Sequence, residues 1–122
     1  MTTSIDSDAK FDRIVERDKF VRTGPGTLAG RYLRSYWQPV YVSEKLAKES
    51  IVPIRILGEG LALYRGESGE ARVMTDECPH RLSVLSTGWI EGETIRCRYH
   101  GWRFDESGRC VEQPAEPKPF CA

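Results

Sequence analysis

Histidine is scarce in this sequence, which contains only two among its 122 residues, beside four cysteines. Charge of one sign is not in excess, because 18 Lys and Arg balance 18 Asp and Glu, so nothing indicates a nucleic acid or a membrane surface as a partner. No apolar run approaches the roughly 20 residues that a bilayer-spanning helix needs, and the start, MTTSIDSDAK, lacks the features of a signal peptide. We therefore expect a cytoplasmic protein, in which paired cysteines indicate metal or redox chemistry more often than disulfides.

The first part of the chain has weak helical patterns. Residues 1–27 are expected to form a flexible or weakly helical lead, with apolar residues at loosely helical spacing from Phe11 to Phe20. Thr27 is placed to cap a short helix that runs through Tyr36. A second helical turn is predicted after Ser43, with that serine as its cap.

From residue 51 the pattern changes to short β-rich segments divided by glycine and acidic turns. This pattern predicts a mainly β fold, a small antiparallel β domain over residues 28–122. The last nine residues contain three prolines and are not expected to form a central strand. No closing element is evident, so we expect the domain to be incomplete at its carboxyl end. The predicted strands are IVPIRIL, LALYR and ARVMT, followed by short segments near TIRC, WRF and CVE.

Both histidines stand beside cysteines, in two short motifs. The first is Cys78-x-His80 and the second is Cys97-x2-His100, with sixteen residues between them. Four soft-to-borderline ligands in two close pairs suit a tetrahedral sulfur and nitrogen environment around metal. The motifs therefore predict a metal centre.

Chance, structural zinc, a nucleophilic thiol and a disulfide each account for these motifs less well. Chance is improbable because the chain has no spare histidines from which such pairs arise. A structural zinc site is less consistent with the motifs, since Cys-x-His is an uncommon first half of a zinc motif. A Cys–His nucleophile needs one thiol and one base, and leaves the second pair without a role. A disulfide between the two cysteines accounts for neither histidine.

Cys-Pro-His-Arg followed by Cys-x-Tyr-His-Gly-Trp resembles the signature of the Rieske [2Fe–2S] proteins. The resemblance implies that Cys78 and Cys97 hold one iron, and that His80 and His100 hold the other. Neutral imidazoles in place of two thiolates make the cluster less negative, so it accepts an electron more easily. The expected reduction potential is roughly −150 to +300 mV, against about −400 mV for an all-thiolate ferredoxin.

Neighbouring residues have supporting roles in this interpretation, each with a plain alternative. Pro79 is expected to stiffen the first loop and Gly101 to permit a tight turn. Tyr99 and Trp102 either shield the cluster and donate hydrogen bonds or pack in the core, and Arg81 faces either a partner or solvent. Outside the motif, Cys110 is expected in the β core, whereas Cys121 has no assigned role.

The resemblance extends over about residues 28–120. RYLRSYWQPVYVSEKL, GEGLALYRGESGEARVMTDECPHR and YHGWRFDESGRCVEQPAEP are similar to the start of the large subunit of Rieske non-haem iron oxygenases, in the phthalate dioxygenase and O-demethylase branch. Freestanding Rieske ferredoxins generally lack the Tyr-Trp-x-Pro-Val lead. Residues 82–84, Leu-Ser-Val, depart from the small residues that often follow Cys-Pro-His-Arg, which affects the choice of subfamily rather than the cluster.

In that family a catalytic domain follows, with a mononuclear Fe(II) held by two histidines and a carboxylate. Here the cluster uses both histidines, so this chain is not expected to be catalytic by itself. The implied function is electron relay in an aromatic-ring-hydroxylating or demethylating oxygenase, from a reductase or ferredoxin to the catalytic domain of a neighbouring subunit in a homotrimer. The alternative is a stand-alone Rieske-type electron carrier.

Overall fold

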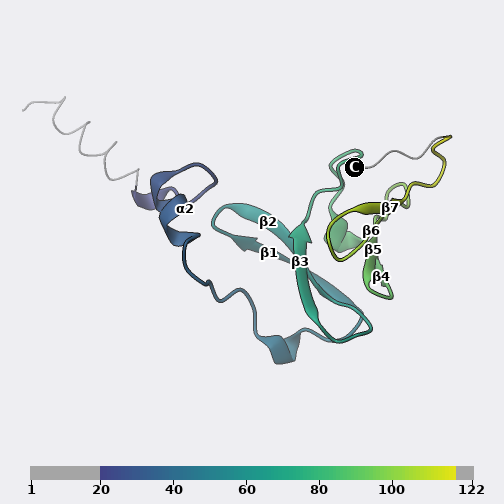
Figure 1. The fold of residues 1–122 in the computed structure, drawn as a ribbon, viewed down its shortest axis with the longest axis horizontal. Coiled ribbons are helices and arrows are strands. Elements are labelled where there is room, and N and C mark those ends of the chain that lie inside the picture. The colour runs from purple at the N-terminus through teal and green to yellow at the C-terminus, as the bar shows by residue number, and fades with distance from the viewer. Residues whose placement is uncertain (1–19, 118–122) are drawn as a thin grey trace, which may run out of the picture. The chain divides into compact units, whose positions relative to one another are not determined.

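The computed structural model describes residues 20–117, and the chain divides into two compact units between Pro39 and Val40. The first unit contains one short helix, and the second contains two antiparallel sheets (Figure 1). No helix within residues 20–117 has the length and apolar character required to cross a bilayer. The predicted mainly β, antiparallel class is therefore confirmed.

Helix α2 (Leu28–Leu33) begins at its predicted cap. The Thr27 hydroxyl accepts a hydrogen bond from the Gly30 N–H at 3.1 Å, which satisfies one of the free donors of the first turn. The prediction that the helix continues through Tyr36 is wrong. The Gln38 side-chain amide donates to the Leu33 carbonyl at 2.9 Å, so this last helical carbonyl is satisfied without a further turn. The helical pattern predicted between Phe11 and Phe20 lies almost entirely outside the described residues.

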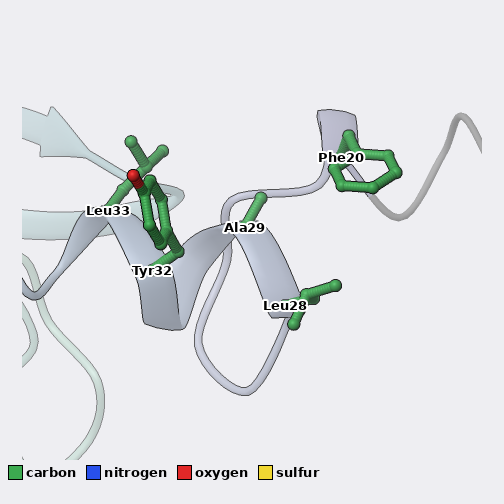
Figure 2. A pocket seen from close by; sticks show the side chains of 5 residues that line it. All are labelled: Phe20, Leu28, Ala29, Tyr32 and Leu33. Atoms are coloured by element: carbon green, nitrogen blue, oxygen red, sulfur yellow. The ribbon is translucent and has the colours of Figure 1, made fainter.

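The apolar side chains of this unit border an open pocket of about 490 Å³. Figure 2 shows the side chains that line it: Phe20, Leu28, Ala29, Tyr32 and Leu33. Leu28 and Tyr32 are more than half exposed. The predicted apolar face of the helix is thus present, and the described part of this unit leaves it open.

In the second unit, a single 3₁₀ turn, η1 (Ser43–Lys45), occupies the predicted helical turn. The predicted cap is wrong, because Val42 precedes the turn and makes no side-chain capping bond. The Ser43 hydroxyl instead lies 3.0 Å from a guanidinium nitrogen of Arg65, from which it accepts a hydrogen bond. A contact with a distant strand has replaced the local cap.

The first sheet consists of β1 (Ser50–Ile56), β2 (Glu59–Arg65) and β3 (Ala71–Thr75), with β2 in the middle. Leu57 and Gly58 both have positive φ, which is the conformation of the tight hairpin turn that suits the twist of two antiparallel strands. Pro53 lies in β1, an edge strand of this sheet, where a missing N–H is tolerated. All three strands match their predicted segments.

The second sheet has four short strands in sequence order, joined as an antiparallel meander (Figure 1). The 3₁₀ turn η2 (Leu85–Thr87) precedes it. The first strand was not expected from the sequence, since three residues are too few to show alternation. The strands are β4 (Trp89–Glu91), β5 (Thr94–Arg96), β6 (Arg103–Phe104) and β7 (Cys110–Glu112).

One hydrophobic core joins the two sheets of this unit. Its fully buried members are Ala62, Tyr64, Cys78, Leu85, Ile95, Cys97, Trp102, Phe104 and Cys110. The Tyr64 hydroxyl reaches across to donate to the Glu93 carbonyl at 3.3 Å. Cys110 is a core residue, as predicted. Both motif cysteines also belong to the core, so the candidate site is built into the most rigid part of the domain.

Candidate metal centre

The two motifs fold into two loops of equal length with the same backbone pattern. The first cysteine loop is residues 78–83 and the second cysteine loop is residues 97–102. The residues that flank each loop form equivalent antiparallel pairs: Glu77 with Val84, and Arg96 with Arg103.

Inside the first cysteine loop, two backbone hydrogen bonds hold a tight turn. The Cys78 N–H donates to the Ser83 carbonyl and the Cys78 carbonyl accepts from the Leu82 N–H, both at 2.8 Å. Leu82 has a φ of 55°, the left-handed region that a leucine rarely adopts. The loop therefore turns through a strained residue.

The second cysteine loop repeats this arrangement. The Cys97 N–H donates to the Trp102 carbonyl at 2.8 Å, and the Cys97 carbonyl accepts from the Gly101 N–H at 3.0 Å. Gly101 has a φ of 78° at the position equivalent to Leu82. Here glycine occupies the left-handed conformation without a steric cost. In both loops, the shared turn places the cysteine at the buried end.

The two thiols meet in the core. Cys78 and Cys97 are 2% and 1% exposed, and their side chains are hydrogen-bonded to each other. Burial, together with the Cys97 thiol, raises the pKa of Cys78 to about 11, although the backbone N–H groups of His80 and Arg81 that face its sulfur act in the opposite direction. A metal bound here must displace these protons, and its positive charge favours the thiolates.

The two imidazoles lie together at the outer end of the loops. The rings of His80 and His100 have centroids 4.5 Å apart and meet at 64°. His80 stacks on Trp102 with centroids 4.4 Å apart and planes 2° from parallel. The Nδ1 atom of His80 is buried and has no hydrogen-bond partner among the described residues. A buried ring nitrogen without a partner is the state expected of a metal ligand shown without its metal.

His100 is exposed, and its ring lies 3.8 Å from that of Tyr99, centroid to centroid. Desolvation lowers the pKa of His100, and the charges of His80 and Arg81 add to this effect. The neutral imidazole is therefore favoured, which is the form that coordinates a metal.

Comparison with known proteins follows the same two loops. A family model described as the Rieske [2Fe-2S] domain matches residues 36–121. The chain belongs to the Rieske [2Fe–2S] domain family. The predicted family and the predicted cofactor, a Rieske [2Fe–2S] cluster, are thus confirmed.

Relatives of this Rieske domain are oxygenase components. It is 43% identical over 101 residues to the 5,5'-dehydrodivanillate O-demethylase oxygenase subunit of Sphingobium sp., covering 83% of the chain and 24% of that protein. It is 46% identical to the tert-butanol monooxygenase / tert-amyl alcohol desaturase oxygenase subunit of Aquincola tertiaricarbonis, covering 81% and 21%. A crystal structure of dicamba monooxygenase with non-heme iron and dicamba matches with a TM-score of 0.65 at 36% identity, covering 69% and 25%. The chain spans about a quarter of the length of these relatives.

The donor set of this Rieske domain fits a two-iron cluster better than a single metal ion. No group of three or more His, Cys, Asp or Glu side chains within residues 20–117 is arranged to hold one ion. A [2Fe–2S] cluster asks for only two protein ligands at each iron, which is what an inner thiol pair and an outer imidazole pair supply. Cys78, Cys97 and Cys110 are free thiols, so the motif cysteines are not joined in a disulfide.

The neighbouring residues singled out in the sequence divide into buried and exposed groups. Trp102 is 1% exposed, and its ring covers one face of His80. Gly101 is half-buried and lies against Pro114, whose ring carbon is 3.4 Å from the position of a hypothetical Cβ. The exposed group forms a rim around the imidazoles: Pro79, Arg81, Leu82, Arg98, Tyr99 and His100.

Two anchors of the cysteine loops were not anticipated from the sequence. Asp76, just before the first loop, accepts from the Ser86 N–H at 2.7 Å and from the Ser86 hydroxyl at 2.9 Å. Arg96, just before the second loop, donates to the Gly101 carbonyl at 2.7 Å. A charged residue within two positions of each motif cysteine was the only available signal, and charged residues at strand ends are too common for that signal to be specific.

Proposed function

We propose that this chain is the electron-transfer domain of a Rieske oxygenase that hydroxylates or demethylates an aromatic substrate. The observation that carries the proposal is the pair of equivalent loops, with two buried thiols at the inner end and two imidazoles at the outer end. The relatives are oxygenase subunits, which favours this function over a freestanding ferredoxin. We further propose residues 28–122 as the extent of the domain and residues 1–27 as its lead.

In this proposal Cys78 and Cys97 hold the inner iron, and His80 and His100 hold the outer iron. When bound, the cluster supplies reversible one-electron transfer. The protein residues determine the direction of access: the core closes over the thiol end, whereas His100 is exposed. Electrons therefore enter and leave through the imidazole end, with Trp102 excluding water from one face of His80.

The exposed rim suggests the character of the electron donor. Arg81 and Arg98 place two positive charges beside Tyr99 and the exposed imidazole of His100. A reductase or ferredoxin with an acidic docking surface complements this rim, and such complementarity raises association rates at low ionic strength. The proposed acceptor is a mononuclear non-haem iron in the catalytic domain of a neighbouring subunit, within a homotrimer.

The test is cluster incorporation into the 122-residue chain. Iron and sulfide are quantified, and the dithionite-reduced protein is examined by electron paramagnetic resonance. The expected result is two irons per chain and the low average g value of a cluster with mixed sulfur and nitrogen ligands. Cys78→Ser and His100→Ala are expected to abolish this signal.

Cys110→Ser is the matched control, because Cys110 is also a buried free cysteine but lies outside both loops. It is expected to keep the cluster signal. A colourless protein with one zinc per chain would overturn the proposal, as zinc has no redox chemistry. Loss of the signal in the Cys110 variant alone would overturn the ligand assignment.

A further inference from the structure

Arg96 is the residue through which the second sheet holds the second cysteine loop. It ends strand β5, immediately before Cys97. Its Nη1 atom donates to the Gly101 carbonyl at 2.7 Å, so the guanidinium reaches over the loop. That carbonyl belongs to the short stretch between His100, a proposed ligand, and Trp102.

The guanidinium is fixed by two carboxylates. Glu91 accepts from Nε at 2.7 Å and from Nη2 at 2.8 Å, which is the two-pronged geometry that suits arginine. Glu112 accepts from Nη2 at 2.9 Å. The Arg96 side chain is only 16% exposed, so these charge-assisted bonds are partly shielded from water.

The carboxylates are held in turn by other strands. The indole N–H of Trp89 donates to Glu91 at 2.8 Å, and Arg103 pairs with Glu112 at 3.1 Å. Each of the four strands of the second sheet therefore contributes one member of a charged network, which we call the four-strand network: Glu91 from β4, Arg96 from β5, Arg103 from β6 and Glu112 from β7. Its hydrogen bonds converge on one loop carbonyl.

The same peptide influences the first loop. Trp102 follows Gly101 directly and stacks on His80, which belongs to the first cysteine loop. A guanidinium that fixes the Gly101 carbonyl therefore constrains His100 on one side and the Trp102–His80 stack on the other. The exposed imidazole end of the site contains no other such anchor among the contacts described for these two loops.

We infer that Arg96 is a positioning residue that holds both imidazoles in one geometry by fixing the Gly101 peptide. This inference rests on the proposed function, since it concerns ligands of the cluster. Arg96 touches neither the thiols nor the imidazoles, and acts through the loop backbone. Its effect is on the uniformity and the retention of the cluster.

The experiment compares Arg96→Met, which removes the fork but keeps an apolar stem, with Arg96→Lys, which keeps only the charge. Wild-type and variant chains are loaded with cluster. The expected result for Arg96→Met is a broadened g spectrum and cluster loss to a chelator about 10- to 100-fold faster, the range observed when residues supporting metal ligands are removed. Arg96→Lys is expected to restore only part of the retention, because an ammonium lacks the fork geometry.

Arg65→Met is the matched control. Arg65 also uses its guanidinium to hold backbone carbonyls, donating to Leu46 at 2.9 Å and to Gly69, but it lies in the first sheet, away from both loops. It is expected to lower the melting temperature while leaving the g values and the rate of cluster loss unchanged.

Three outcomes distinguish a positioning role from general stabilisation. A wild-type spectrum and wild-type retention in Arg96→Met would overturn the positioning role. Equal cluster loss in Arg96→Met and Arg65→Met at equal loss of melting temperature would reduce it to general stability. If Arg96→Met does not fold, Glu91→Gln provides the same measurement, with spectral broadening expected and an unchanged spectrum counting against the inference. Failure of the wild-type chain to bind a cluster would instead refute the proposed function.

Discussion

The left-handed turn of the first cysteine loop gives a prediction whose sign reverses the usual order of substitutions. Leu82 has a φ of 55°, and about two thirds of the residue is exposed to solvent. Placing a residue with a Cβ in this region costs about 1 to 2 kcal/mol. Glycine avoids that cost, but elsewhere in regular structure it is less stable than alanine by about 0.5 to 1 kcal/mol. Leu82→Gly and Leu82→Ala lose the same leucine contacts, so their difference isolates the backbone conformation.

We therefore expect Leu82→Gly to be more stable than Leu82→Ala by about 0.5 to 1 kcal/mol. For a domain of this size that difference corresponds to a few degrees of melting temperature, at about 4 to 8 °C per kcal/mol. Thermal unfolding of both variants under reducing conditions, followed by circular dichroism, measures it. The equivalent pair at Val73, an exposed residue of β3, is the control, and there alanine is expected to be the more stable.

The reasoning is refuted if glycine is less stable than alanine at Leu82 by the same margin as at Val73. That result would mean that the loop does not adopt the left-handed turn in solution. The conformational match between the two cysteine loops would then be lost as well, since Gly101 has this conformation in the second loop.

Three further predictions concern the support of the site. A Cβ at Gly88 would overlap the Arg96 carbonyl, so Gly88→Ala is expected to cost about 1 to 3 kcal/mol in urea unfolding; Gly60→Ala, in open space, is expected to change stability by less than about 1 kcal/mol. Hydrogen bonds from the Arg96 and Trp89 side chains lower the pKa of Glu91 from 4.5 to about 2. Because the folded-state pKa is the lower one, the stabilisation by Glu91 is present above pH 4.5 and is lost as the pH falls toward 2; Glu91→Gln should flatten this part of a stability profile. Trp102→Leu should lower unfolding stability by about 3 kcal/mol and broaden the g spectrum of the loaded chain, whereas Trp102→Phe retains an aromatic face and should preserve the spectrum.

Each of these has an outcome that contradicts it. Equal stability of the Gly88 and Gly60 variants would mean that η2 and β5 do not approach closely. An unchanged acid profile in Glu91→Gln would mean that this carboxylate does not stabilise the fold. Identical spectra for the leucine and phenylalanine variants would show that stacking on His80 does not define the imidazole geometry.

Local chemistry was predictable where one short segment determined the structure. Thr27 caps its helix because a threonine hydroxyl needs only the next three residues to find a donor. The first three strands were predicted because β-branched and aromatic residues alternate between turn residues, and because Gly58 marks the tight turn.

Prediction from the sequence failed where a distant residue competed with a local one. The Ser43 hydroxyl accepts from Arg65 rather than capping its own turn. Helix α2 stops at Leu33, where Gln38 satisfies the last carbonyl. Strand β4 forms because β5 is available to pair with it, although its three residues have little pattern of their own.

The sequence by itself determined which four side chains form the candidate site. The chain has two histidines, each within three residues of a cysteine, and this spacing is a covalent property that folding does not alter. It also determined the family, since the motif and the residues around it are a linear pattern.

Only the tertiary structure decided how those side chains are supported. The cross-loop stack of Trp102 on His80 and the four-strand network around Arg96 join residues that come together when the loops and strands have formed. Such contacts depend on where several strands end in space, which no local pattern encodes. The sequence identifies the ligands, and the fold brings the imidazoles together and provides their anchor.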